Sequence, residues 1–276
     1  MKISGAIVGA RVGPIECRVD ARWMMAYSAA LGERDARCYD TRRPEGVVAH
    51  PLFPVCYEWP LVLGLRERAG LKALDARVVH AQHDLLIHRP PRAGETLSLG
   101  ARIAAAVQRK PGALVVTRQE ARAADGKPVT TTLQGSRYRG VTVESESGAA
   151  EDPPAAPRDL APVGTIEVPA RLAHVYTECA RIWNPIHTDL AYALAAGLPH
   201  IILHGTATLA LAVSRLLEAR GARFEQVRRV HCRFGATVPM PATLALLARH
   251  EAMASSFEVA REDGERAIAR GAIDLV

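Results

Sequence analysis

Residues 205–219 read GTATLALAVSRLLEA and carry the strongest structural signal in the chain. The segment has the length of a helix, yet apolar residues cover most of its circumference instead of forming one stripe. Such a helix is stable in water only when other elements enclose it. Gly221 follows it, as glycine commonly follows the last helical turn. We therefore predict a buried central helix in the second half of the chain.

Four short segments follow this helix and are expected to be strands. They alternate in part between apolar and polar residues, and turns rich in Gly and Pro, such as PMP and EDGE, separate them. One long helix lying against a curved antiparallel sheet is the hot-dog arrangement, which is an α+β fold. The expected strands are residues 227–235, 242–251, 256–262 and 266–275.

The first half of the chain repeats this order of signals, which indicates an internal duplication. Its strands are expected near 78–88, 95–108, 113–123 and 128–139. The two central helices are expected to end at Gly70 and Gly221. Two hot-dog units side by side can join their sheets, so we predict a double hot-dog fold. The alignment of the halves pairs Tyr27 with Tyr176, Glu33 with Ile182, Cys38 with His187, and His50 with His204.

A segment rich in Ser, Ala, Pro and acidic residues, ESESGAAEDPPAAPRDLAPV, separates the copies. The sequence therefore predicts an N-terminal hot-dog domain at 1–143, a linker at 144–163 and a C-terminal hot-dog domain at 164–276. Because a duplicated chain already holds two paired copies, both a monomer and a homodimer fit this plan.

Composition limits the possible partners and compartments. No segment approaches the roughly 18 consecutive apolar residues of a membrane span. The five cysteines are scattered and odd in number, which argues against a disulfide framework or a thiolate metal site and favours the cytoplasm. The net charge is +6, but the arginines are dispersed and no nucleic-acid-binding motif occurs, so nucleic acid is not expected. A small phosphate-bearing ligand stays possible, because only a few arginines are needed to bind it.

The sequence contains one HxxH pattern, a spacing that can occur in metal sites. His80 and His83 lie three residues apart on an expected strand, where this spacing places side chains on opposite faces. We therefore predict no metal site.

The segment from Tyr176 to Gly205, with WNPIHTDLAYALAAG and ILHG, resembles the MaoC-like family of (R)-specific enoyl-CoA hydratases and dehydratases. The first half, with HPLFPV and HRPPRAGETL, resembles the family's degenerate amino-terminal domain. The resemblance implies a lyase of fatty acid metabolism that reversibly hydrates a trans-2-enoyl-CoA to a 3-hydroxyacyl-CoA. It implies no metal or redox cofactor, because coenzyme A arrives as part of the acyl-CoA thioester.

In that family an Asp and a His, five residues apart, flank a water molecule. His187 falls on the histidine, and an imidazole can serve as base or acid near neutrality. Asn184 falls on an asparagine that holds the water or orients the segment, and Pro185 stiffens the turn. Gly205 is expected to offer a backbone N–H to the thioester oxygen at the start of the helix, and the alternative is a close helix–sheet contact.

The first half lacks these groups, because Cys38 and Pro51 occupy the positions of the histidine and the glycine. Proline has no N–H to donate. We therefore expect one active site per chain. The resemblance implies that the first half supplies the groove for the acyl chain and part of the coenzyme site.

The second half also departs from the family at the aspartate position, which holds Ile182. Isoleucine exchanges no proton, and loss of a general acid or base commonly costs about 10²–10⁴-fold in rate. Three explanations stay open. Glu178 or Asp189 replaces the carboxylate; or His187 acts alone in hydration, dehydration or thioester hydrolysis; or catalysis is lost, leaving an acyl-CoA-binding protein or a partner subunit of a hydratase.

Two neighbours of Ile182 complete the candidate site. Trp183 either caps the acyl pocket beside Ile182 or is a core aromatic. Arg181, at the position of a family glycine, either meets a coenzyme phosphate or lies on the surface.

Overall fold

The computed structural model describes residues 1–155, 157 and 159–276. The elements of the first half are β1 (Lys2–Ile3), η1 (Gly5–Ile7), β2 (Arg11–Arg18), α1 (Ala21–Ala30), η2 (Ala36–Cys38), α2 (Pro54–Arg68), η3 (Lys72–Arg77), β3 (Val78–Ile87), β4 (Thr96–Arg109), β5 (Gly112–Arg122), β6 (Pro128–Arg139) and β7 (Thr142–Val143). Those of the second half are β8 (Ala161–Val168), α3 (Leu172–Ala180), η4 (Pro185–His187), α4 (Leu190–Ala195), α5 (Gly205–Arg220), η5 (Phe224–Gln226), β9 (Val227–Phe234), β10 (Ala242–His250), β11 (Ala254–Ala260) and β12 (Arg266–Leu275).

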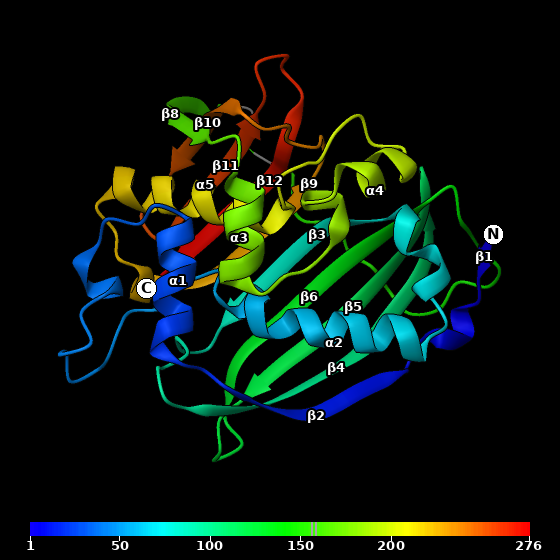
Figure 1. Cartoon of the computed structure of the whole chain (residues 1–276), viewed down its shortest axis with the longest axis horizontal. Coiled ribbons are helices and arrows are strands. Elements are labelled where there is room, and N and C mark those ends of the chain that lie inside the picture. Colours follow the sequence, from blue (N-terminus) through cyan, green and yellow to red (C-terminus); the bar gives the residue numbers. More distant parts are fainter. Residues whose placement is uncertain (156, 158) are drawn as a thin grey trace.

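Ten strands form one antiparallel sheet in the order β2-β4-β5-β6-β3-β9-β12-β11-β10-β8. The order of the second half mirrors that of the first, as a duplication requires. The halves join where β3 pairs with β9, with Gln82 opposite Arg233. Figure 1 shows α2 lying across the strands of the first half and α5 beside those of the second. This arrangement confirms the predicted double hot-dog fold.

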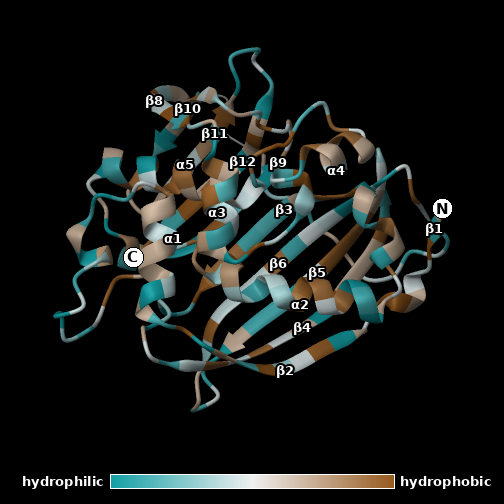
Figure 2. Ribbon diagram, viewed as in Figure 1, coloured by the Kyte–Doolittle hydropathy of each residue, from teal (hydrophilic) through white to brown (hydrophobic). Residues whose placement is uncertain are grey.

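The central helices bury the surfaces that the sequence indicated. Helix α5 spans Gly205–Arg220 and ends at Gly221, which adopts the left-handed conformation with a φ of 64°. Its apolar residues pack into a core shared with α2, in which Leu61 and Leu65 of α2 and Leu209 and Leu216 of α5 are almost fully buried. Figure 2 shows hydrophobic residues gathered along β5, whereas the middle of β3 is hydrophilic. Among the described residues, no helix is both long and apolar enough to cross a membrane.

Part of the segment predicted as a linker, 144–163, lies against the outer face of the sheet. Its residues 156 and 158 lie outside the described residues, and β8 already begins at Ala161. Ala150 packs against an apolar patch on that face, and the Gln82 side chain donates a hydrogen bond to the carbonyl of Glu151 at 3.2 Å. The division into two domains and a linker stays a prediction.

The pair of tyrosines used to align the halves meets at the centre of the molecule. The hydroxyls of Tyr27 on α1 and Tyr176 on α3 lie 3.3 Å apart, and both side chains are fully buried. The Tyr27 hydroxyl also lies 3.3 Å from the carbonyl oxygen of Leu52, and the Tyr176 hydroxyl lies 3.2 Å from the Thr206 hydroxyl. The repeat therefore has its equivalent residues facing each other beside the start of α5.

We predict that this contact couples the halves. Tyr27→Phe and Tyr176→Phe are each expected to lower the free energy of unfolding by about 1–2 kcal/mol, because each leaves buried polar partners unsatisfied. The double variant should lose less than the sum, since both single changes remove the same contact. Urea denaturation of the four proteins measures this. Strictly additive losses would show that the two hydroxyls do not interact.

Candidate functional site

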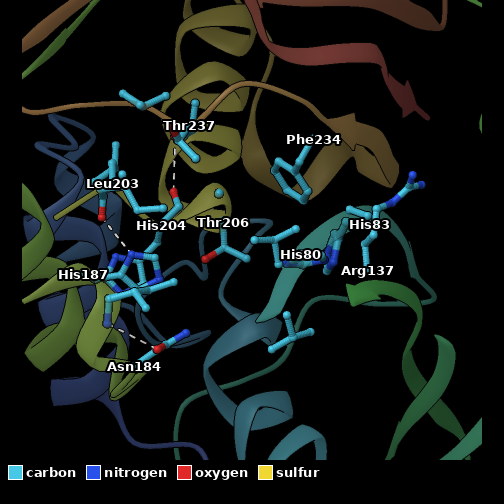
Figure 3. Close-up of a pocket in the computed structure, with 18 of the residues that line it drawn as sticks. His80, His83, Arg137, Asn184, His187, Leu203, His204, Thr206, Phe234 and Thr237 are labelled. Carbon is cyan, nitrogen blue, oxygen red and sulfur yellow. Dashed lines mark hydrogen bonds between the residues drawn. The ribbon is translucent and has the colours of Figure 1, made fainter. Parts of the chain in front are cut away.

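A cavity of about 450 Å³ lies where the two halves meet. Strand β9 pairs with β3 over Gln82–Leu86 only. The residues of β3 before Gln82 are therefore not paired with β9, and they line the cavity. Phe234 lies across from that edge, with its ring 4.7 Å from the ring of His80. Figure 3 shows the residues that line this space. Both halves therefore build one cavity.

His187 stands in the cavity wall with a defined tautomer. Its Nδ1 lies 2.8 Å from the carbonyl oxygen of Ile202. A carbonyl only accepts, so Nδ1 carries the proton and Nε2 keeps a free lone pair. Burial lowers the pKa of His187 to about 4, against the opposing effect of the Ile202 hydrogen bond. The imidazole is neutral at pH 7 and can accept a proton.

A second imidazole holds this segment in place. His204 stacks on His187 with ring centroids 3.6 Å apart. Its Nε2 bonds the Thr177 hydroxyl at 3.2 Å and the carbonyl of Ile182 at 3.4 Å. Burial, and then the nearby His187, hold the pKa of His204 well below its usual range. Two neutral rings can stack without charge repulsion, so His204 fixes the position of His187.

Asn184 caps the short helix η4 that ends at His187. Its side-chain oxygen accepts from the N–H of Ile186 at 3.4 Å. Its amide NH₂ stays available as a donor on the cavity wall (Figure 3). Pro185 occupies the first position of η4 and is exposed, outside the cavity lining.

The start of α5 supplies backbone donors to the same wall. The first intrahelical bond of α5 runs from Thr208 N–H to the carbonyl of His204 at 3.0 Å, so earlier N–H groups have no helical partner. Gly205 and Thr206 both line the cavity. A Cβ at Gly205 would lie 3.1 Å from the Phe234 ring. The absence of a side chain at Gly205 therefore allows close packing against Phe234 and leaves the backbone N–H accessible from the cavity.

The carboxylates predicted as replacements do not reach the cavity. Ile182 lines it and is 6% exposed, so the family's aspartate position is apolar. Glu178 is exposed on α3, and Asp189 caps α4 by accepting from Tyr192 N–H at 3.0 Å. Neither side chain is part of the cavity lining.

Two further predicted residues lie on the surface. Trp183 is 59% exposed and is not among the lining residues. Arg181 stacks over the ring of Trp23 at 4.2 Å and pairs with Asp20 at 3.7 Å. Its φ of 58° is left-handed, which explains the family's preference for glycine at this position.

The predicted placement of His80 and His83 on opposite faces of their strand was wrong. A bulge in the pairing of β3 with β6, between His80 and Gln82, shifts the alternation of side chains. Both rings therefore lie on one face, 5.3 Å apart, and both line the cavity. Among the described residues no group of three or more potential metal ligands gathers.

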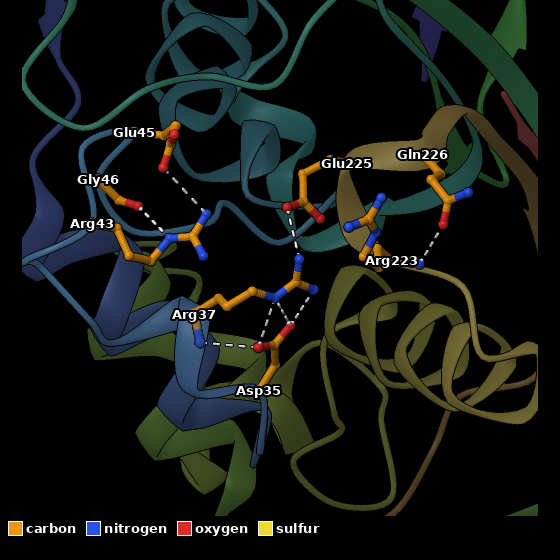
Figure 4. Close-up of polar contacts among 8 residues, drawn as sticks. All are labelled: Asp35, Arg37, Arg43, Glu45, Gly46, Arg223, Glu225 and Gln226. Carbon is orange, nitrogen blue, oxygen red and sulfur yellow. Dashed lines mark hydrogen bonds and ion pairs between the residues drawn. The ribbon is translucent and has the colours of Figure 1, made fainter.

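The equivalent position in the first half is filled by polar contacts between the halves. Cys38 ends η2 as His187 ends η4, and burial raises the pKa of its thiol to about 12. Arg37 pairs with Asp35 at 2.6 Å and with Glu225 of the second half at 3.0 Å (Figure 4). Glu33, the counterpart of Ile182, accepts a hydrogen bond from Ser214 on α5.

Two models of protein families match this chain. Residues 164–269 match the model of the MaoC like domain, and residues 6–132 match that of the FAS1-like, dehydratase domain region. The chain belongs to the MaoC-like dehydratase family. No curated protein sequence is similar enough to this MaoC-like chain to count as a relative.

Solved structures of low sequence identity share the fold. A MaoC-like dehydratase from Phytophthora capsici superposes with a TM-score of 0.83 at 21% identity, covering 98% of this chain and 96% of that one. The peroxisomal multifunctional enzyme type 2 of Drosophila melanogaster gives 0.77 at 21% identity, covering 95% of this chain but 48% of that one. A Mycobacterium tuberculosis protein with a double hot-dog fold gives 0.61 at 14% identity, covering 98% and 96%.

The low pKa of His187 predicts a dependence of stability on pH. Its folded value of about 4 lies below the 6.5 of an exposed imidazole, so the unfolded chain binds this proton more readily. Stability should therefore fall as the pH drops from about 6.5 to about 4. In His187→Asn this fall should be shallower, whereas His174→Asn, at an exposed position on α3, should keep the wild-type slope. Urea denaturation across this pH range tests it, and identical slopes in all three proteins would contradict the assignment.

Proposed function

We propose that this MaoC-like protein interconverts a trans-2-enoyl thioester and the 3-hydroxyacyl thioester, with His187 as its acid–base group. The observation that carries the proposal is the free Nε2 of His187, which lies on one cavity wall with the Asn184 amide and the start of α5. A base, a polar group for water and donors for an oxyanion are the parts that hydration requires.

The reaction balances with one imidazole. In hydration, His187 Nε2 takes a proton from water while the water oxygen bonds to C3 of the enoyl group. Electrons move to the thioester oxygen, where the N–H groups at the start of α5 stabilise the negative charge. The protonated His187 then returns its proton to C2. Dehydration is the same sequence reversed. Asn184 donates its amide hydrogen bond to the water oxygen.

Ile182 makes this mechanism slower than a two-group one. The Ile182 side chain cannot share the proton transfers, so in this mechanism one imidazole both accepts and donates. Its low pKa makes His187 a weak base but a strong acid once it is protonated. The second candidate function, acyl-thioester binding without turnover, is favoured by this same isoleucine.

Arginines at the cavity support a phosphate-bearing carrier such as coenzyme A. Arg137 and Arg233 line the cavity and are half-buried. Burial, and then the charge of Arg233, lower the pKa of Arg137. Two guanidinium groups so close together attract an anion, and phosphate suits their donor geometry.

The proposed reaction is tested by incubating the protein with a panel of enoyl-CoA thioesters and measuring product formation by mass spectrometry. We predict turnover by the wild type and a loss of about 10²–10⁴-fold in His187→Ala. Ile182→Asp should raise the rate, because it places a carboxylate on the wall that holds His187. Activity that appears only in Ile182→Asp would instead identify a binding protein.

The arginines predict a difference between carriers. In Arg137→Ala and Arg233→Ala the KM for an acyl-CoA should rise about tenfold, because a charged hydrogen bond to phosphate is lost. The KM for the same acyl group on pantetheine, which has no phosphate, should not change. Arg42→Ala, at an exposed position outside the cavity, is the control. An equal rise in the KM for the acyl-CoA and for the acyl-pantetheine would show that these arginines do not bind the phosphates of coenzyme A.

A further inference from the structure

The cavity has a second wall, which is polar and comes from the first half. Glu58 on α2, His83 on β3 and Gln134 on β6 all line the cavity, and they are 4%, 1% and 8% exposed. We call these three side chains the polar wall. Hydratase chemistry at His187 does not use them.

The polar wall lies between α2 and the sheet beneath it. The Thr132 hydroxyl on β6 donates to the Glu58 carboxyl at 2.5 Å, which places Glu58 on the sheet side of the helix. His83 and Gln134 face each other on paired strands. The half-buried Arg137 and Arg233 lie nearer to solvent, so the polar wall is the deeper part of the cavity.

In the described part of the chain, His83 of the polar wall and its neighbour Gln119 have buried polar atoms without hydrogen-bond partners. Both ring nitrogens of His83 are unpaired although the side chain is 1% exposed. Gln119 donates to Gln134 at 3.2 Å, but its own side-chain oxygen is unpaired. An unsatisfied buried polar group costs about 1–3 kcal/mol, so such a group calls for an explanation.

The charge state of the polar wall restricts what can fill it. Burial lowers the pKa of His83 to about 4, opposed by Asp84, so the ring is neutral at pH 7. Burial raises the pKa of Glu58 to about 7, opposed by the Thr132 hydrogen bond. His80, whose ring is 5.3 Å from His83, is also held neutral by burial. None of these three groups is a cation, and the guanidinium of Arg66, which also lines the cavity, lies 3.7 Å from the Asp75 carboxylate.

We propose that the polar wall is a subsite for a hydroxyl group on the acyl chain, so that the substrates are thioesters of hydroxylated acyl groups, aliphatic or phenolic. A hydroxyl both donates and accepts, and a neutral imidazole offers one donor and one acceptor. One hydroxyl can therefore pair with one ring nitrogen of His83 and with the Glu58 carboxyl, whose partner Thr132 lies on β6 two residues before Gln134, the residue opposite His83. The proposal rests on the thioester function proposed above, because the polar wall and His187 line one cavity.

The test measures binding rather than turnover, so that it does not depend on catalysis. Isothermal titration calorimetry compares two pairs of saturated thioesters: octanoyl-CoA with its ω-hydroxy derivative, and phenylacetyl-CoA with its para-hydroxy derivative. In at least one pair the wild type should bind the hydroxylated member about tenfold or more tightly, as the loss of one buried hydrogen bond predicts.

The variant His83→Phe should abolish this preference and leave the affinity for the parent thioesters nearly unchanged. It breaks no hydrogen bond of the described part of the chain, so it is expected to fold. His88→Phe, at an exposed position just after β3, is the matched control and should keep the preference. Glu58→Leu should act like His83→Phe.

Two outcomes overturn the subsite. Equal affinities within both pairs for the wild type would show that no hydroxyl is recognised. An equal loss for parent and hydroxylated thioesters in His83→Phe would assign the polar wall to the pantetheine arm. Binding of the thioesters without turnover of any enoyl thioester would overturn the proposed reaction but not the subsite. Absence of binding by all four thioesters would overturn both proposals.

Discussion

The pairing of β3 with β9 joins the two halves, and the cavity exists because this pairing stops at Gln82. The buried apolar residues of α2 and α5 belong to one core cluster that includes residues of both halves. Where β9 leaves β3, the edge of one half faces Phe234 of the other. The segment that carries Asn184 and His187 closes the same space. The pairing of the halves and the proposed active site therefore depend on one junction.

Much of the fold was predictable from the sequence. The apolar circumference of residues 205–219 and the repeated strand signals identified both central helices and eight of the strands, because burial leaves a periodic pattern. The tyrosine alignment was correct, since Tyr27 and Tyr176 meet at the centre. Helices α1 and α3 and strands β2 and β8 were not predicted individually, because short elements with half-exposed patterns resemble loops.

The candidate site was predictable only where a motif marked it. Asn184, His187 and Gly205 lie on one cavity wall, as the motif indicated. The bulge in β3 that brings His80 beside His83 leaves no mark in the alternation of residues. Glu58 sits in a mostly apolar helix, where the sequence gives no sign that its carboxyl faces a cavity. The exposure of Trp183 depends on how the chain turns after α3 and could not be predicted from its neighbours.

The proposed chemistry depends on keeping the His187 imidazole neutral, with Ile182 instead of a carboxylate at the neighbouring position. The hydrogen bond from His187 Nδ1 to Ile202 sets the tautomer, and the stacked His204 sets the position of the ring. The measurement that tests this most directly is ¹⁵N NMR of the His187 ring, assigned with His187→Ala, as the pH is lowered and an enoyl thioester is added. We predict the Nδ1–H tautomer, still neutral at pH 5, with an Nε2 resonance that moves on addition of the thioester. An Nε2–H tautomer, protonation near pH 6.5, or no response to the thioester would contradict the assignment of His187 as the base.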